Sequence, residues 1–296
     1  MSHCELIFDL GFHRGEDTDH YLALGHRVVA LEANRDLVEA GQERFASAIR
    51  SGQLTLVHAA VVGHGRGLEQ VAFHPHPSRS EWGSVDLRWV RRNAEAHGLP
   101  HADPVVVTTV SLPDLVQRHG TPWLLKIDIE GADEEVLADL SLLDPRPAYV
   151  SWETGKESLR AVLAQHRRLQ QLGYDRFRIV QQAFMERRPG PLLANGEPYR
   201  FASGASGPTP ANHGGAWHDL GRVALHYRLL FLIYALIGPR SAFVAASRSR
   251  HRWLAWGPSR LRRWMAARGL PFPGWVDSHA AQRRAVSRSL PSSSST

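Results

Sequence analysis

The first residues whose types and spacing could support chemistry lie in the segment IFDLGFHRGEDT, residues 7–18. Its apolar start predicts a short strand and its acidic end predicts the start of a helix, so Gly11 and Gly15 would lie in the turn between them. Glycine permits a tight turn there and lets a ligand approach the backbone closely. Asp9 precedes the turn, where a carboxylate suits a cationic ligand better than a pyrophosphate.

Two interpretations of this turn remain open. The first interpretation is a dinucleotide-binding fingerprint, which requires glycine at the third position of Gly-x-Gly. His13 occupies that position, so the chain lacks the glycine on which this interpretation depends. S-Adenosylmethionine carries an ammonium and a sulfonium, and its carboxylate could bind at the N-terminus of the following helix. The alternative is a structural glycine turn in which Asp9 acts as a cap.

A second acid, Glu32, ends the segment RVVALE, 23 residues after Asp9. In nucleotide-binding α/β folds an acid near this spacing, at the tip of the second strand, accepts hydrogen bonds from ribose hydroxyls. An acid at a strand end is ordinary by itself. Its position after the glycine turn favours a nucleoside site.

The segment LLKIDIEGADEEVL, residues 124–137, begins with alternating apolar and charged residues. Strand geometry puts Lys126, Asp128 and Glu130 on one face. Charges are costly inside a parallel sheet, so this strand should open into a cleft at its carboxyl end, where α/β folds bind ligands. The alternative is an edge strand with a solvated face. Lys126 would lie deepest, as a structural ion-pair partner.

These three segments, in this order and spacing, resemble the FkbM family of S-adenosylmethionine-dependent methyltransferases over about residues 5–155. A later segment, SGPTPANHGGAW at residues 206–217, resembles a C-terminal segment of part of that family, where Gly-Pro-Phe-Gly is more usual. Thr209 and Pro210 depart from that pattern. Residues 12–14, Phe-His-Arg, stand where many members have Ala-Asn-Ile, which keeps the backbone turn but removes the Asn side chain.

The resemblance implies a class I methyltransferase fold, which is an α/β fold with a Rossmann-like, doubly wound, mostly parallel seven-stranded sheet, and S-adenosylmethionine as cofactor. For most members it also implies O-methylation of a hydroxyl on a sugar, glycan or natural product. It assigns the methionine end of the cofactor to the glycine turn, the ribose to Glu32, and the sulfonium and acceptor to the vicinity of Asp128. The implied cofactor-binding residues are Asp9, Gly11, His13, Gly15, Thr18, Glu32, Ala33, Asn34 and Asp128.

Methyl transfer to a hydroxyl needs an aligned proton acceptor. We predict Asp128 and Glu130 as the catalytic residues, because both would face the cleft, and Glu153 is a third candidate. His13 and His58 are the histidines near predicted strand ends, and a histidine pKa suits a base better than that of a carboxylate. Two nearby acids are weak evidence for a divalent ion, so we predict no metal site.

The elements that must position these residues follow from an alternation of short apolar segments and amphipathic ones, which predicts a parallel sheet with helices on both faces. The predicted strands are 6–8, 27–31, 54–62, 105–110, 123–129 and 148–152, and the predicted helices are 16–24, 37–49, 112–119, 132–140 and 158–172. Two loop-rich segments, 64–86 and 189–215, should cover the active-site face.

Composition excludes several classes of protein. The 296 residues are 43% hydrophobic and 22% charged, which suits a globular core and excludes wholesale disorder. One cysteine, Cys4, excludes an internal disulfide and a cysteine zinc site. No signal-peptide pattern is present, and the longest apolar run, Leu229–Ile237, has nine residues against about 20 for a membrane span. We therefore predict a cytoplasmic protein that does not span a membrane.

The positive charge is concentrated near the C-terminus. The whole chain has a net charge of +6, whereas residues 240–296 carry +10, from eleven arginines and one acid, Asp277. Four tryptophans lie among these arginines. We interpret the region as a packed helical cap with a basic outer face. Peripheral membrane contact is an alternative, and nucleic-acid binding is less favoured.

The predicted organisation is a cofactor-binding core over 1–188, a loop and helix covering the active-site face over 189–239, and a basic helical extension with a disordered tail over 240–296. The expected partner is a small-molecule or glycan hydroxyl acceptor. The sequence specifies neither its identity nor the oligomeric state. The alternative function is a non-catalytic protein with a degenerate nucleotide-binding fold, associated with a membrane or nucleic acid.

Overall fold

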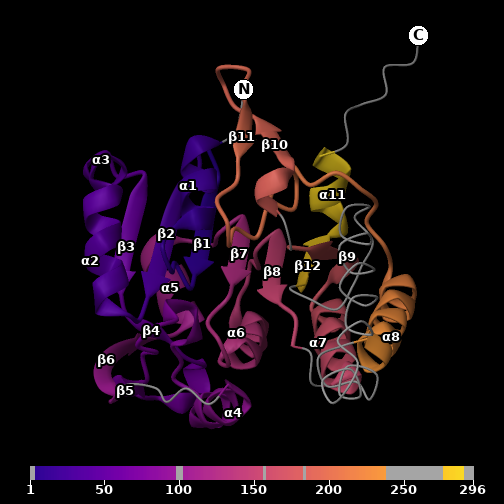
Figure 1. Ribbon diagram of the computed structural model, residues 1–296. Coiled ribbons are helices and arrows are strands. Elements are labelled where there is room, and N and C mark those ends of the chain that lie inside the picture. The colour runs from indigo at the N-terminus through magenta and orange to yellow at the C-terminus, as the bar shows by residue number, and fades with distance from the viewer. Residues whose placement is uncertain (1–3, 98–102, 156–157, 183–184, 238–275, 290–296) are drawn as a thin grey trace, which may run out of the picture.

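The computed structural model describes residues 4–97, 103–155, 158–182, 185–237 and 276–289. Its centre is a seven-stranded sheet in the order β3-β2-β1-β7-β8-β12-β9 (Figure 1). Neighbouring strands are parallel except where β12 pairs with β8 and β9. This confirms the Rossmann-like, mostly parallel α/β fold. The strands are β1 (Leu6–Leu10), β2 (Arg27–Glu32), β3 (Leu54–His58), β7 (Leu124–Ile127), β8 (Tyr149–Glu153), β9 (Tyr174–Gln181) and β12 (Val276–Gln282).

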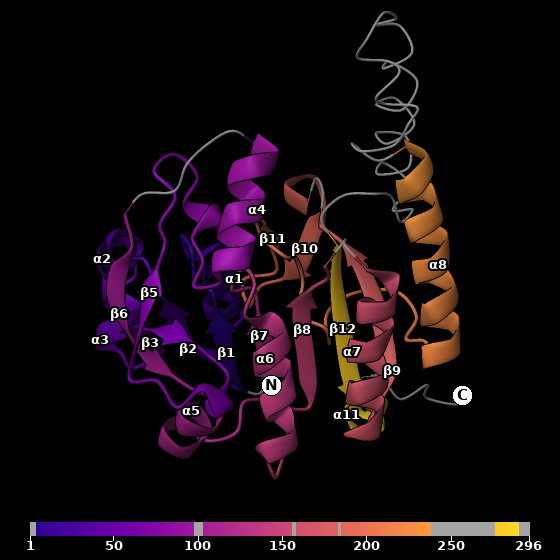
Figure 2. The same cartoon turned by 90° about the horizontal axis from the view of Figure 1, so that it is seen from below.

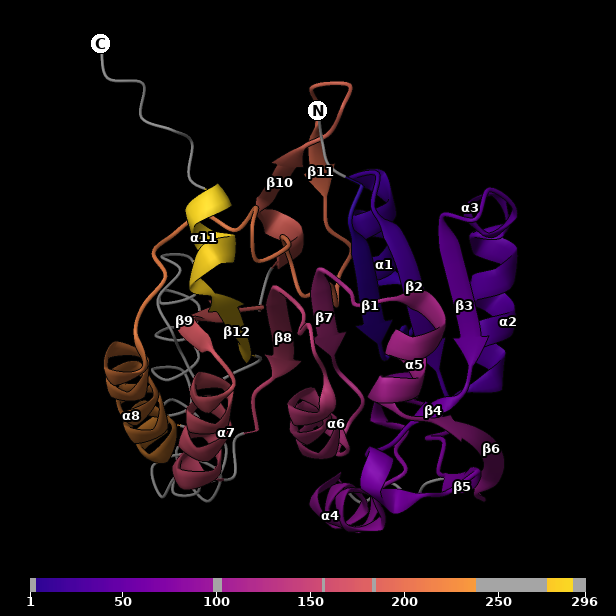
Figure 3. The same ribbon diagram turned by 180° about the vertical axis from the view of Figure 1, so that it is seen from behind.

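Helices pack against both faces of this sheet, which Figures 1 and 3 view from opposite sides. Because side chains alternate along a strand, Phe8 joins the core cluster under α5, α6, α7 and α8, whereas Ile7 joins the cluster under α1. Phe45, between α2 and α3, belongs to the second cluster. The helices are α1 (Glu16–Ala23), α2 (Arg35–Arg44), α3 (Ala46–Arg50), α4 (Leu87–His97), α5 (Leu112–His119), α6 (Asp133–Asp139), α7 (Leu159–Gln171), α8 (Leu220–Ile237) and α11 (Arg283–Ser289).

Local sequence explains where the helices near the site begin. Helix α1 follows a left-handed residue, Gly15, and has three acids in its first turn, where the helix dipole favours negative charge. Helix α2 is capped by Asn34, whose side chain accepts a hydrogen bond from the backbone N–H of Asp36. The predicted single helix over 37–49 is therefore two helices, which join at Phe45.

The predicted strand 105–110 does not belong to the central sheet. It forms β6 (Val105–Val110), which pairs with β4 (Ala60–Val61) and β5 (Gln70–Phe73) in a small separate sheet. Its first two valines are largely exposed, with 71% of Val106 accessible, which a central strand buried on both faces would not tolerate. This small sheet and α4 lie beyond the carboxyl ends of β1, β2 and β3 (Figure 3).

The predicted domain division at residue 240 is wrong for the end of the chain. Residues 276–282 form β12, inserted between β8 and β9, so this segment completes the main sheet and is not an extension. The sequence VDSHAAQ hides the strand because Asp277, Ser278 and His279 are polar yet buried. The four tryptophans, most of the arginines of the predicted cap, and residues 290–296 of the predicted tail lie outside the described residues.

Helix α8 does not cover the active-site face as predicted for 189–239. It lies beside α7 at the β9 end of the sheet (Figure 2) and buries Val223 and Tyr227 in the core cluster there. Among the described helices, none has the length and apolar character that crossing a membrane requires. The hairpin of β10 (Pro189–Leu192) and β11 (Pro198–Arg200) precedes α8.

Candidate active site

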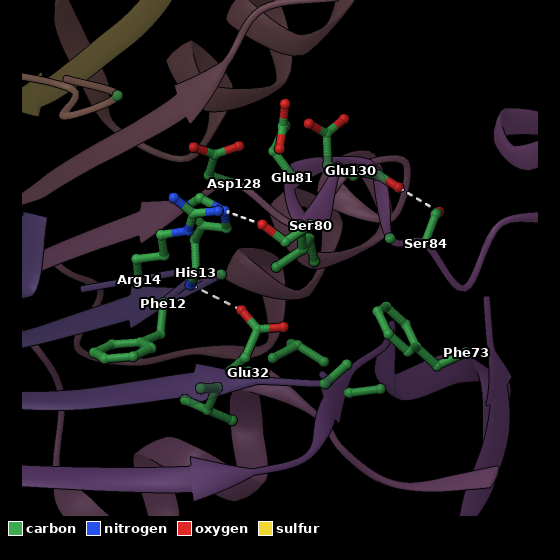
Figure 4. Close-up of a pocket in the computed structure, with 18 of the residues that line it drawn as sticks. Phe12, His13, Arg14, Glu32, Phe73, Ser80, Glu81, Ser84, Asp128 and Glu130 are labelled. Atoms are coloured by element: carbon green, nitrogen blue, oxygen red, sulfur yellow. Dashed lines mark hydrogen bonds between the residues drawn. The ribbon is translucent and has the colours of Figure 1, made fainter. Parts of the chain in front are cut away.

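A pocket of about 690 Å³ opens at the carboxyl ends of β1, β2 and β7 (Figure 4). Sheets of this type bind ligands there, where the strand order reverses at β1. Both predicted cover loops contribute to its lining. The segment 78–85 supplies most of one wall, and Ser203 and Gly204 come from the second loop.

Glu32, at the end of β2, is fixed against the turn after β1. Its Oε2 accepts a hydrogen bond from the backbone N–H of His13 at 2.8 Å, and its Oε1 accepts one from the N–H of Asn34 at 2.9 Å. Burial raises the pKa of Glu32, and these two backbone donors oppose that effect. The carboxylate lines the pocket (Figure 4), so its remaining acceptor capacity is available to a bound ligand.

Close packing, as well as a positive φ angle, requires glycine at both positions of this turn. Gly11 has φ 93°, and a Cβ there would lie 1.8 Å from the carbonyl oxygen of Asp128, so only glycine lets the turn approach the end of β7. Gly15 has φ 79°, and a Cβ would lie 2.6 Å from the ring of Phe45. Gly11 lines the pocket, whereas Gly15 lies outside the lining and serves the start of α1.

Asp9 and Thr18 lie beneath the pocket and not in its lining, which differs from the direct cofactor contact that the resemblance implied. Both are fully buried, and the Thr18 hydroxyl donates to Asp9 Oδ2 at 2.6 Å. Asp9 Oδ1 pairs with Lys126 Nζ at 3.2 Å. Asp9 can therefore influence a ligand only by holding Lys126 and α1 in place.

Lys126 is a structural ion-pair partner, as the sequence predicted. Besides Asp9, its Nζ lies 3.1 Å from Asp17 Oδ2 and 3.6 Å from Asp128 Oδ2. Burial alone would lower the pKa of Lys126, but these carboxylates raise it well above its ordinary value. Asp17, which no sequence pattern marks as a site residue, also accepts a hydrogen bond from the backbone N–H of Ser206 at 2.8 Å and so ties α1 to the second cover loop.

Asp128 and Glu130 both line the pocket, on the side opposite Glu32 (Figure 4). Burial raises the pKa of Asp128, against the opposing charge of Lys126. Glu130 has a left-handed backbone at φ 49°, and its carbonyl oxygen accepts a hydrogen bond from the Ser84 hydroxyl. The loop after β7 is thus fixed to the first cover loop.

The histidines differ in position. His13 lines the pocket, and its Nε2 lies 2.9 Å from the Ser80 hydroxyl, which joins the first turn to the cover loop (Figure 4). His58 lies outside the pocket lining, with its Nε2 3.1 Å from the carbonyl oxygen of Ala33. Ala33 lines the pocket and Asn34 does not. Sequence reasoning missed Ser80 and Ser84, because no motif marks these two serines within the loop.

Comparison with known proteins identifies the family. Residues 9–175 match the family described as "Methyltransferase FkbM domain". This chain belongs to that family. The resemblance found in the sequence is confirmed, and the protein is an S-adenosylmethionine-dependent methyltransferase.

Solved structures similar to this FkbM methyltransferase have low identity. The C-terminal domain of precorrin-6Y C5,15-methyltransferase from Rhodobacter capsulatus is 14% identical with a TM-score of 0.35, covering 67% of this chain and 75% of that one. A SAM-dependent methyltransferase from Geobacter sulfurreducens in complex with S-adenosyl-L-homocysteine is 10% identical with a TM-score of 0.33, covering 95% and 84% respectively. Likeness at this level carries no argument about the reaction. A search of curated proteins finds no match.

The chemistry of the pocket of this FkbM methyltransferase fits its cofactor. Glu32 offers a fixed carboxylate for ribose hydroxyls, and Ala33 with Ala60 and Phe73 provides apolar surface beside it for a nucleobase. Asp128 places negative charge at the far side, where a sulfonium and an ammonium are favoured. When bound, the cofactor supplies a methyl group as an electrophile on a positively charged sulfur.

Proposed function

We propose that this methyltransferase acts on a hydroxyl group of a sugar, glycan or related natural product. The observation that supports the proposal is the position of Asp128, a pocket-lining carboxylate whose pKa is raised by burial. A carboxylate with a raised pKa is a better proton acceptor for a hydroxyl than an ordinary one. Ser80, Glu81 and Glu130 line the same pocket and offer hydrogen-bond partners for a polyhydroxylated acceptor.

In the proposed reaction Asp128 accepts the proton of the acceptor hydroxyl. Lys126, 3.6 Å from Asp128 Oδ2, orients that carboxylate and limits how far its pKa rises. The first cover loop, held by the Ser80–His13 and Ser84–Glu130 contacts, excludes water from the cofactor side and presents its hydroxyls to the acceptor. Each of these roles belongs to residues that line or support one pocket.

The test measures transfer of a radioactive methyl group from S-adenosylmethionine to a panel of sugars and glycans, with amines and thiols as comparison acceptors. Asp128→Asn keeps the side-chain volume and removes the base. We expect its rate with the best hydroxyl acceptor, at saturating cofactor, to fall at least about 100-fold. Glu43→Gln, an exposed change on α2, serves as the matched control and should leave the rate unchanged.

Three results would count against the proposal. Methylation confined to amines or thiols would show that the acceptor is not a hydroxyl. An unchanged rate in Asp128→Asn would transfer the role of base to Glu130 or Glu153. Cofactor binding without methylation of any acceptor would instead favour the non-catalytic alternative.

A further inference from the structure

Three acidic side chains meet beside the pocket in an arrangement that the proposed reaction does not require. Asp128, Glu130 and Glu153 each offer one carboxylate oxygen, and these atoms lie within 4.8 Å of one another. They come from the end of β7, the loop after it, and the end of β8. Clustered carboxylates alone are common on protein surfaces, so the arrangement needs independent support.

The sheet register shows that part of this cluster is built into the fold. Ile127 is paired with Trp152 across the parallel strands β7 and β8, so the next residues along each chain, Asp128 and Glu153, lie in one row. Glu153 is paired in turn with Asp277 across the antiparallel strands β8 and β12. Directly opposed residues extend to the same face of a sheet. Three acids of adjacent strands therefore line up at one end of the sheet, on one face.

Asp277 provides independent support for a cation site at this cluster. It is only 3% exposed, and its Oδ1 has no hydrogen-bond partner among the described residues. A buried carboxylate oxygen without a partner is costly, and a positive ion beside it removes that cost.

Lys126, which lies near Asp128, pairs more closely with carboxylates outside this cluster. Lys126 is shared among Asp9, Asp17 and Asp128, with contacts of 3.2, 3.1 and 3.6 Å. Two of these three carboxylates belong to β1 and α1, on the far side from β8 and β12. Among the described residues, the Lys126 ammonium thus faces three carboxylates, those of Asp9, Asp17 and Asp128.

We propose that Asp128, Glu130 and Glu153 bind one hard divalent cation, of the Mg²⁺ or Mn²⁺ type, and that Asp277 adds a fourth carboxylate behind the site. All candidate ligands are carboxylate oxygens, which these ions prefer, whereas the site offers no thiolate. Asp128 and Glu130 line the pocket, so the open positions of the ion would face it.

The role of the ion in catalysis rests on the proposed function. An ion at this place would bind the oxygen of the acceptor hydroxyl and lower its pKa, as metal ions do for bound water. The O–H bond would then break with the electron pair remaining on the oxygen held by the ion. The Asp128 oxygen that does not bind the ion, a weak base for an uncoordinated alcohol, would then suffice to receive the proton. The prediction of no metal site from the sequence is replaced by this proposal, because Glu153 and Asp277 become neighbours of Asp128 only in the folded sheet.

The test measures binding of Mn²⁺ itself to the full chain after treatment with a chelator, by loss of the free-ion electron paramagnetic resonance signal, with no acceptor present. We expect one ion per chain. Glu153→Gln, whose residue is not part of the pocket lining, should weaken Mn²⁺ binding by about 10-fold or more, the usual loss when a site is altered. Asp277→Asn should weaken it too, and Glu43→Gln should not.

Binding of S-adenosylhomocysteine by calorimetry reports whether each variant is folded, so failure to fold is recognised. No Mn²⁺ bound at millimolar concentration, or equal affinity in wild type and a folded Glu153→Gln, would overturn the proposal. The two proposals fail separately. Hydroxyl methylation at full rate in excess chelator would remove the ion and keep the hydroxyl acceptor, whereas Mn²⁺ binding without hydroxyl methylation would keep the ion site and remove that acceptor.

Discussion

At the scale of single residues, we predict that Glu32 joins the backbone to the bound cofactor. Both of its oxygens are held by backbone N–H groups, of His13 and Asn34, so the carboxylate is oriented before any ligand binds. A charged acceptor of this kind contributes about 1.5–3 kcal/mol to a buried hydrogen bond. We predict that Glu32→Gln loses that amount of S-adenosylhomocysteine affinity in calorimetry, because one oxygen becomes an NH2 group. Glu39→Gln, exposed on α2, is the control, and equal affinities would move the ribose site elsewhere.

Asp133 gives the site a pH dependence. Burial, and then the charge of Asp128, raise the pKa of Asp133 from 3.8 to about 6, although the N–H groups of Ile129 and Gly131 donate to it. The folded state therefore binds this proton more tightly than the unfolded chain. The resulting stability is present below pH 3.8 and is lost as the pH rises through about 6.

We predict that replacing Asp133 by Asn removes this dependence. Urea denaturation between pH 4 and pH 7 should show the wild type losing free energy of unfolding relative to Asp133→Asn as the pH rises. Asp103→Asn, an exposed change two residues before β6, supplies the comparison. Stability curves of wild type and Asp133→Asn that stay parallel over this range would show an ordinary pKa for Asp133.

At the scale of elements, a buried charged cluster at the floor of the pocket, to whose lining Asp17 and Lys126 belong, connects β1, α1 and β7. Asp9, Asp17 and Lys126 are each at least 95% buried, and removing Lys126 would leave buried carboxylates without their counter-charge, at a cost of about 3–5 kcal/mol. We predict that Asp9→Asn lowers the melting temperature while the folded variant keeps its cofactor affinity. Lys126→Met, which leaves Asp17 as well as Asp9 without a counter-charge, should lower the melting temperature more than Asp9→Asn does. Weakened cofactor binding without destabilisation would reinstate Asp9 as a direct ligand.

The elements that the sequence predicted well are those with strong local patterns. The β1–turn–α1 unit, β2 and β7 were placed within a few residues because apolar strands end at charged or glycine residues there. Residues 105–110 were correctly predicted to form a strand. Their local sequence, however, does not distinguish a strand of the main sheet from one in a small neighbouring sheet. Strand β12 was missed because its buried Asp277, Ser278 and His279 violate the apolar pattern, and only pairing with β8 and β9 accounts for them.

The candidate site was predictable to a similar extent. Glu32 and Asp128 follow from strand ends and spacing, and both line the pocket. The contributions of Ser80 and Ser84 depend on how a loop folds back over the sheet, which no spacing encodes. The position of Asp9 below the pocket depends on Lys126, 117 residues later, which competes for the same carboxylate.

At the scale of the whole molecule, α8 presents an apolar outer face. Leu225, Leu229, Leu232 and Leu236 are each more than half exposed, and their spacing places them on one side of the helix. The arginine-rich segment follows directly in the sequence. Peripheral membrane contact therefore stays a prediction. The protein should float with vesicles that contain anionic lipid, and a smaller fraction of it should float at high salt. Leu229→Glu should weaken this association with vesicles. Retention on polynucleotide instead of vesicles would favour the nucleic-acid alternative.

The end of the chain provides the test of how the molecule is assembled. Strand β12 separates β8 from β9, and the Ser278 hydroxyl lies at hydrogen-bond distance from the Tyr227 hydroxyl of α8 and the Thr154 hydroxyl after β8. A chain ending at Pro239 lacks this strand, so β8 and β9 lose their hydrogen-bond partners and the core loses Val276 and Ala280.

We predict that the chain ending at Pro239 aggregates and shows no cooperative unfolding by circular dichroism. A chain ending at Ser289, which keeps β12 and α11, should retain wild-type melting temperature and cofactor affinity. Both truncations remove the same terminal residues, so a difference between them isolates residues 240–289. A soluble, cofactor-binding chain ending at Pro239 would show that the sheet closes without β12. The region after residue 239 would then be a separate appendage, against both the predicted cap and the observed sheet.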